Sequence, residues 1–223
     1  MKEILKFKDI IDRELNKLDF PYQPHNLYDP IKYMLCLDAK RIRSIALLMT
    51  HHLYNNSYKN AINAAIAIEM FHNFTLIHDD IMDNASLRRN SPTVHSKWNN
   101  NIAILSGDAL LVKSYMMLLK LDAKVQNQVI DKFSKTAITV CEGQQMDMDF
   151  ENNNNLILDD YIKMIEKKTS VLFASSFEIG AIIGGATKID QSLIYQFGLN
   201  LGIAFQLQDD LLDLYGDKSK FGK

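Results

Sequence analysis

The distribution of proline is the feature that most constrains the fold. All four prolines lie in the first half of the chain, at Pro21, Pro24, Pro30 and Pro92, and none occurs from Thr93 onward. Proline interrupts a helix because it lacks the amide donor and clashes with the preceding turn. Long helices are therefore possible throughout the second half of the sequence.

Apolar residues recur at steps of three and four, and strand-like alternation is nearly absent, a pattern typical of amphipathic helices. One stripe runs through residues 62–77 and includes two polar members, Glu69 and Asn73. The sequence therefore predicts an all-α bundle. We expect its helices near residues 3–16, 28–36, 40–54, 58–83, 98–120, 123–150, 159–184 and 190–215.

Composition and charge indicate an ordinary globular protein. The chain has 223 residues, of which 47% are hydrophobic and 23% charged, as in average soluble domains. The formal net charge of −2 argues against a dominant nucleic-acid surface, so we expect no nucleic-acid partner. Since no linker or repeat divides the sequence, we expect a single domain over residues 1–223.

Neither a targeting segment nor a membrane anchor is evident. Charged residues interrupt the N-terminus before an apolar signal core could form, and the longest weakly polar stretch, residues 171–186, contains Glu178 and is too short to span a bilayer. We therefore expect a cytoplasmic protein without stable membrane insertion, in which Cys36 and Cys141 are small buried hydrophobes.

Two aspartate clusters share the spacing Asp-Asp-x-x-Asp, and each follows an apolar run. The first is Asp79, Asp80 and Asp83, and its first and last members lie one helical turn apart on the same face. A single such cluster is often only a solvated helix end. The second copy, Asp209-Asp210 with Asp213, makes coincidence a poor explanation.

Facing carboxylates repel one another strongly unless cations lie between them. Mg²⁺ commonly takes one or two carboxylates together with substrate phosphates. The paired clusters therefore predict a site for several Mg²⁺ ions and a diphosphate. The basic groups that could bind the phosphate oxygens are Lys40 with Arg41 and Arg43, Arg88 with Arg89, and Lys167 with Lys168. Each pair or triplet alone could also be a surface patch.

Two histidines lie on the expected helix that carries the first cluster. His72 comes two turns before Asp79 and could donate a hydrogen bond to a second diphosphate. His78 directly precedes Asp79, which is also compatible with the His-Asp pair of metal phosphohydrolases. That alternative requires further upstream histidines, for which His51-His52 is a poor candidate.

These residues together resemble the trans-isoprenyl diphosphate synthases, the polyprenyl synthetase family, over nearly the whole chain and in the family's order. The segments that carry the resemblance are Leu76–Asp83 with Leu87-Arg88-Arg89, Ser106–Leu110, Gly143–Asp147, Lys168-Thr169 and Phe205–Asp213. The resemblance implies a helical bundle of the isoprenoid synthase type around a central cavity, two or three Mg²⁺ ions, and a homodimer.

The resemblance also implies roles for individual residues. The aspartates that would bind Mg²⁺ are Asp79, Asp83, Asp209 and Asp213, with Asp80 and Asp210 also in the catalytic set. The residues that would hold the allylic diphosphate are Arg88, Lys168, Thr169, Gln206 and Lys223, with Lys168 also catalytic. Those that would hold isopentenyl diphosphate are Lys40, Arg43, His72 and Arg89.

The chain departs from the family pattern at two places. Asp38-Ala39-Lys40-Arg41-Ile42-Arg43-Ser44 stands where the family has Gly-Gly-Lys-x-x-Arg-Pro, so the basic pair is kept but the glycines and the proline are not. The sequence also stops at Lys223, where the family continues with further helices. We therefore expect a domain without the C-terminal helices.

The implied reaction condenses isopentenyl diphosphate with an allylic prenyl diphosphate. Phe74 comes more than one turn before Asp79 and would form the floor of the product cavity, which implies products of C15 to C20, with C20 favoured. Two alternatives stay open. A non-catalytic or regulatory subunit would account for the two departures, and a class I terpene cyclase would ionise a similar substrate without isopentenyl diphosphate.

Overall fold

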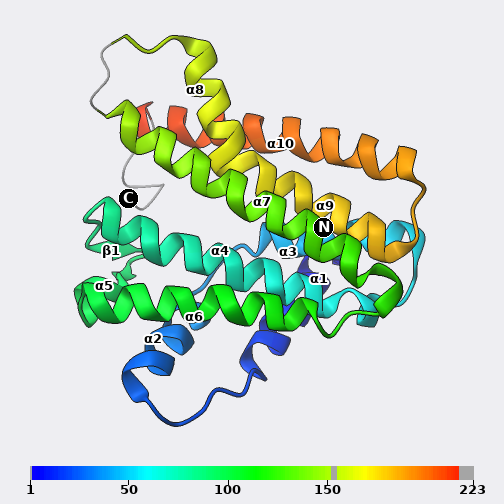
Figure 1. Cartoon of the computed structure of the whole chain (residues 1–223), viewed down its shortest axis with the longest axis horizontal. Coiled ribbons are helices and arrows are strands. Elements are labelled where there is room, and N and C mark those ends of the chain that lie inside the picture. Colours follow the sequence, from blue (N-terminus) through cyan, green and yellow to red (C-terminus); the bar gives the residue numbers. More distant parts are fainter. Residues whose placement is uncertain (1, 152–154, 216–223) are drawn as a thin grey trace. The chain divides into compact units, whose positions relative to one another are not determined.

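The computed structural model describes residues 2–151 and 155–215, and these are almost entirely helical (Figure 1). The helices in chain order are α1 (Lys2–Asn16), α2 (His25–Cys36), α3 (Ile42–Tyr54), the 3₁₀ turn η1 (Tyr58–Asn60), α4 (Ile62–Met82), α5 (Val94–Lys97), α6 (Asn100–Leu118), α7 (Ala123–Phe150), α8 (Leu158–Ile165), the π-helical segment η2 (Glu166–Ser170), α9 (Val171–Gly184) and α10 (Lys188–Tyr215). The predicted all-α class is confirmed.

The structure differs from the expected helices mainly at their joints. A two-stranded antiparallel hairpin, β1 (Leu87–Arg88) and β2 (Ser91–Pro92), and the short helix α5 follow α4. Arg89 and Asn90 form the hairpin turn with positive φ angles of 52° and 59°, a geometry that asparagine tolerates well. The expected helix 159–184 is interrupted by η2. Hydrophobic periodicity reveals neither feature, because both depend on backbone geometry over a few residues.

The chain forms two compact units. The first unit comprises the residues up to Ile45 together with Ile62–Leu121. Its central element is α4, in which every residue from Ala64 to Phe71 is buried, so this helix is apolar around most of its circumference. Helix α6 runs beside α4 (Figure 1), and α1, α2 and α5 also contact α4.

The second unit comprises Ala46–Ala61 and the described residues from Asp122 onward. Its central element is α9, which contacts both α7 and α10. A Cβ atom at Gly198 would lie 2.8 Å from Cα of Ala174, and one at Gly202 would lie 2.8 Å from Cα of Ser170. These two glycines, one turn apart on α10, therefore allow its backbone to approach α9 and η2 closely.

Two expectations concern exposure. Both Cys36 and Cys141 are exposed, so the prediction that they are buried is wrong: each falls on an outward face of its helix. Among the described residues, α6 alone is long and apolar enough to cross a membrane, a test that core helices of water-soluble proteins also pass.

Candidate active site

The first aspartate motif lies at the C-terminal end of α4. The amide of Asp83 donates to the carbonyl oxygen of Asp79 at 2.8 Å, so the helical spacing extends through the last aspartate. Asp79 is half-buried and Asp83 is exposed. Their Cβ atoms are therefore about 5–6 Å apart on one face, at the edge of the apolar part of the helix.

The middle aspartate of this motif has a protein partner. Asp80 is 1% exposed, and its Oδ1 accepts a hydrogen bond from Nε of Arg88 at 2.8 Å and lies 2.7 Å from Nη2 of the same guanidinium. Burial raises the pKa of the Asp80 carboxyl, although Arg88 opposes this shift. The buried Oδ2 of Asp80 has no partner among the described residues. Arg88, predicted to bind substrate, is thus engaged with Asp80 in this structure.

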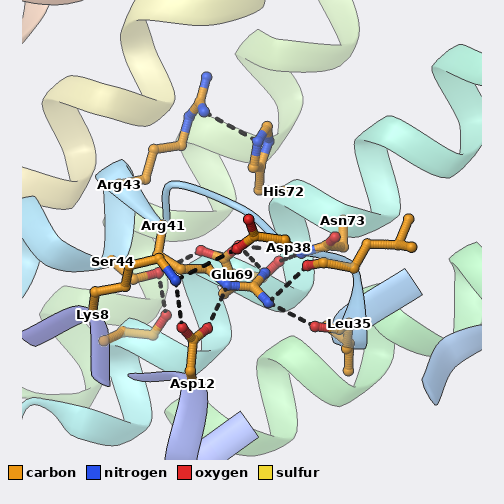
Figure 2. Close-up of polar contacts among 12 residues, drawn as sticks. Lys8, Asp12, Leu35, Asp38, Arg41, Arg43, Ser44, Glu69, His72 and Asn73 are labelled. Carbon is orange, nitrogen blue, oxygen red and sulfur yellow. Dashed lines mark hydrogen bonds and ion pairs between the residues drawn. The ribbon is translucent and has the colours of Figure 1, made fainter. Parts of the chain in front are cut away.

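A cluster of basic side chains lies along α4, one to two turns before the aspartates. Nη1 of Arg43 lies 3.1 Å from Nε2 of His72 (Figure 2). Removal of the imidazole from water, followed by the charges of Arg43, Arg89, Arg88 and Arg41, lowers the pKa of His72 well below its usual value. His72 is therefore neutral and accepts the hydrogen bond from Arg43.

Arg89, which is half-buried, contributes a second guanidinium to this cluster. Burial lowers its pKa, and its buried Nη1 has no hydrogen-bond partner among the described residues. A buried cationic donor without a partner is unfavourable unless an anion binds to it. This part of the first unit therefore has the chemistry of a phosphate site.

The three basic residues at the start of α3, Lys40, Arg41 and Arg43, have different surroundings in the structure. Lys40 is exposed, whereas Arg41 is 5% exposed and makes a buried ion pair with Glu69 that keeps it from a phosphate. Asp38, which replaces a family glycine, has a side chain that is 97% exposed, with Oδ1 3.6 Å from Nζ of Lys8. Only Lys40 and Arg43 of this segment thus remain candidates for a diphosphate.

The second aspartate motif lies in the unbroken final turns of α10. Asp209 is half-buried and Asp213 is exposed, and they are again four residues apart. The middle residue, Asp210, accepts a hydrogen bond from Nε2 of Gln206 at 2.8 Å and another from the hydroxyl of Tyr161 on α8. Burial and the hydrogen bond to Asp210 raise the pKa of Tyr161 to about 12.

The predicted Lys-Thr pair lies within η2. Nζ of Lys168 is 2.6 Å from Oδ2 of Asp147 on α7, and Oγ1 of Thr169 donates to Oε1 of Gln206 at 3.0 Å. A Cβ atom at Gly143 would lie 2.2 Å from the amide nitrogen of Lys168, so only glycine allows α7 to approach so closely. Short π-helical segments occur frequently at functional sites.

His78 is held by α6, and its neighbours there do not form a set of metal ligands among the described residues. Its Nε2 lies 3.1 Å from the carbonyl oxygen of Ile104 and 3.8 Å from Oδ1 of Asp108. Gly107 makes room for the ring, because a Cβ there would lie 2.3 Å from the same nitrogen. Nothing among residues 2–151 and 155–215 brings three or more histidine, cysteine or acidic side chains together for a metal ion. The phosphohydrolase alternative therefore gains no support.

The aspartates suit Mg²⁺ shared with a phosphate ligand. Each motif places two carboxylates on one helix face, and the middle carboxylate already has its protein partner. Mg²⁺ usually keeps open positions for water and phosphate oxygens instead of occupying a cage made only of protein ligands.

The structure thus brings many of the predicted residues together in small groups within each unit. These groups are Arg43 with His72, Asp80 with Arg88, Thr169 with Gln206 and Asp210, and Lys168 with Asp147. Lys223 lies outside the described residues. Tyr161 was not predicted, because a lone tyrosine seven residues before the Lys-Thr pair has no pattern that marks its contact with Asp210.

Comparison with known proteins gives consistent matches. Residues 24–223 match the polyprenyl synthetase family. The geranylgeranyl diphosphate synthase of Methanosarcina mazei is 38% identical over 99% of this chain and 69% of its own length. A crystal structure of a geranylgeranyl pyrophosphate synthase superposes with a TM-score of 0.95 at 47% identity, over 99% of this chain and 67% of that one.

The geranyltransferase of Helicobacter pylori was solved in complex with magnesium and isoprenyl diphosphate. It superposes with a TM-score of 0.87 at 29% identity, over 98% of this chain and 77% of its own.

Proposed function

This chain belongs to the polyprenyl synthetase family, and we propose that it is a trans-prenyltransferase that condenses isopentenyl diphosphate with an allylic prenyl diphosphate. The observation that carries the proposal is the repeated arrangement of the two aspartate motifs. In each, the aspartates at the first and fifth positions share a helix face, while the aspartate at the second position is bound by the protein itself. A helix end with only a structural role does not require this arrangement of carboxylates, and the chain contains it twice.

The carboxylates at Asp79, Asp83, Asp209 and Asp213 are the proposed Mg²⁺ ligands, with two or three ions in total. Bound Mg²⁺ would neutralise charge that develops on the departing diphosphate. Complexation of a structural relative with magnesium and isoprenyl diphosphate supports this assignment. Asp80 and Asp210 keep the motifs in place through their protein partners, and the side chain of Lys168 supplies a positive charge for the leaving group.

The proposed reaction breaks the allylic C–O bond, and the electron pair leaves with the diphosphate. The double bond of isopentenyl diphosphate attacks the resulting carbocation, and a proton lost from the new unit passes to the released diphosphate. Lys168, Thr169, Gln206 and Arg88 are the described residues proposed to hold the allylic diphosphate, with Lys223 beyond them. Apolar side chains must exclude water, because water would quench the cation.

Arg43, His72 and Arg89, together with Lys40, are proposed to hold isopentenyl diphosphate. Nη1 of Arg89, which lacks a partner within residues 2–151 and 155–215, and the arginines around the neutral His72 support an anion at this place. Phe74 is proposed as the floor of the product cavity. It is buried and its ring packs against Phe71 and His78. A C20 product, within a C15 to C20 range, agrees with the name of the Methanosarcina relative.

The remaining proposals concern the domain organisation, cellular location and oligomeric state of the enzyme. We propose a single catalytic domain in the cytoplasm that forms a homodimer. Exposed apolar side chains on α6 support self-association, because Leu105, Val112 and Met116 are each more than half exposed. Light scattering on the purified chain tests the dimer, and a monomer at all concentrations would contradict it.

Consumption of isopentenyl diphosphate tests the proposed function against its alternatives. The chain is incubated with Mg²⁺ and an allylic diphosphate, with and without isopentenyl diphosphate. A synthase forms an elongated product only when both are present. A terpene cyclase would release a hydrocarbon from the allylic substrate alone, and a non-catalytic subunit would leave both substrates intact.

A further inference from the structure

The segment that joins α2 to α3 contains the clearest local departure from the family pattern. It has Asp38-Ala39 in place of two glycines, yet its backbone still makes a sharp turn. Arg41 takes the left-handed conformation, with φ of 52°, which is unfavourable for a residue with a Cβ. The carbonyl of Arg41 accepts from the amide of Ile45 at 2.9 Å, so α3 begins directly from this turn.

The side chain of Arg41 explains how this conformation persists. Its Nη1 lies 2.8 Å from Oε1 of Glu69, and its Nε lies 3.0 Å from Oδ1 of Asp12. Nη2 donates to the carbonyl oxygens of Leu35 and Leu37 at 2.7 and 3.4 Å. The guanidinium thus connects α1, the end of α2 and α4, as Figure 2 shows.

Glu69 is the buried partner of Arg41 on α4. It is 1% exposed, and its Oε2 lies 2.8 Å from Oγ of Ser44. Nδ2 of Asn73 donates to the carbonyl oxygen of Glu69 at 2.7 Å and lies 3.4 Å from its Oε1. Both charges are therefore well paired. This matters because removal of one partner from a buried pair leaves an uncompensated charge.

The same two segments make a second contact one helical turn further along. Glu69 and His72 are three residues apart on α4 and lie on one face. Arg41 contacts the first and Arg43 contacts the second, at 3.1 Å. Figure 2 shows Arg43 and His72 together on one side of the buried ion pair. The Arg41–Glu69 pair therefore fixes the position along α4 at which Arg43 meets His72.

We propose that Arg41 is a positioning residue, whose buried ion pair with Glu69 holds Lys40 and Arg43 in place for the diphosphate of isopentenyl diphosphate. The buried ion pair holds Arg41 in the left-handed conformation from which α3 begins. The inference rests on the proposed function, because it assigns the Lys40–Arg43 segment to that substrate. Arg41 itself does not contact the substrate.

Steady-state kinetics on the whole chain test this inference. Arg41→Lys keeps the positive charge beside Glu69 but cannot reproduce the planar set of donors. We expect the KM for isopentenyl diphosphate to rise about tenfold, while the KM for the allylic diphosphate changes by less than about twofold. In case this variant unfolds, Arg41→Met combined with Glu69→Met removes both buried charges together and is expected to give the same selective change.

A double-mutant cycle separates positioning from simple loss of stability. If Arg41 acts through Arg43, Arg41→Lys adds little to the KM effect of Arg43→Gln. Lys132→Met is the matched control, because it removes a 2.6 Å ion pair with Glu178 in the second unit. It should lower the melting temperature without changing the KM for isopentenyl diphosphate. Equal changes in both KM values, or additive effects of Arg41 and Arg43, would overturn the inference.

Calorimetric titration with isopentenyl diphosphate alone separates failure of the inference from failure of the proposed function. Wild-type binding that Arg41→Lys weakens about tenfold is the expected result. If the wild-type chain binds this diphosphate but never transfers it, the proposed reaction is wrong, and the binding constants still decide the role of Arg41. If the wild-type chain does not bind it, both proposals are wrong.

Discussion

At the scale of single residues, the two aspartate motifs have the same arrangement: protein side chains bind the middle aspartate, and the outer two are the proposed Mg²⁺ ligands. Asp80 is bound by Arg88, and Asp210 is bound by Gln206 and Tyr161. These contacts engage the middle carboxylate of each motif, so the motif can be oriented before any ligand arrives. Pre-oriented groups stabilise developing charge more effectively than groups that must first reorganise.

Tyr161→Phe should impair catalysis by loosening Asp210, since the ring is kept and only the hydroxyl is lost. We expect kcat to fall about tenfold and the Mg²⁺ concentration for half-maximal rate to rise. Tyr195→Phe is the matched control, because its ring lies 3.6 Å from Nζ of Lys132, away from the aspartates. An unchanged Mg²⁺ dependence in Tyr161→Phe would show that its hydroxyl does not position the motif.

His72 should make stability depend on pH. Burial and the neighbouring arginines lower its pKa well below 6.5, so the unfolded chain binds a proton near pH 6.5 that the folded chain does not bind. The free energy of unfolding should therefore fall as pH decreases below 6.5, by roughly 1 kcal/mol at one pH unit lower. Urea unfolding of wild type and His72→Gln at pH 7.5 and 5.5 measures this contribution. The account is contradicted if both proteins lose equal stability on acidification.

At the scale of elements, α4 orders the functional side chains along one axis. Glu69, His72, Asp80 and Asp83 succeed one another toward its C-terminal end, and Phe74 lies between the basic cluster and the aspartates in sequence. With a rise of about 1.5 Å per residue, His72 and Asp80 are about 12 Å apart along the helix. One rigid helix thus sets the spacing between the two proposed diphosphate sites and the product floor.

Phe74→Leu should lengthen the product, because a smaller side chain leaves room for another isoprene unit beyond the floor. We expect the main product to gain five carbons, as measured by chromatography of the dephosphorylated alcohols. Phe71→Leu makes the same chemical change three residues earlier, at a fully buried position, and should reduce stability without lengthening the product. The same product distribution in wild type and Phe74→Leu would rule out Phe74 as the floor.

The sequence predicted the helical class and most helix positions, because apolar periodicity records which face of each helix is buried. It could not reveal η2, in which Lys168 and Thr169 lie, since a π turn leaves no mark on composition. Nor could it separate Arg41 from Lys40 and Arg43. Three basic residues in one segment look equivalent until the backbone conformation of Arg41 turns its side chain toward Glu69.

At the scale of the whole molecule, membership of the polyprenyl synthetase family implies that the two aspartate motifs act together in one reaction. The two aspartate motifs belong to different compact units, and the middle aspartate of each motif is bound by partners within its own unit. The match to the polyprenyl synthetase family extends over residues 24–223 and includes both motifs. The account therefore requires that loss of either motif abolish the reaction, although each motif has separate local partners.

Transfer of label from isopentenyl diphosphate tests this claim most directly. The chain is incubated with Mg²⁺, labelled isopentenyl diphosphate and C5, C10 or C15 allylic diphosphates, as wild type, Asp79→Asn and Asp209→Asn. Asp131→Asn, at an exposed aspartate that pairs with Lys135, is the control. We predict labelled elongated prenyl diphosphates from wild type and control, a loss of about a hundredfold or more in either motif variant, and no product after chelation of Mg²⁺. Absence of label from the wild-type products with every starter, or full activity in both motif variants, would contradict the account.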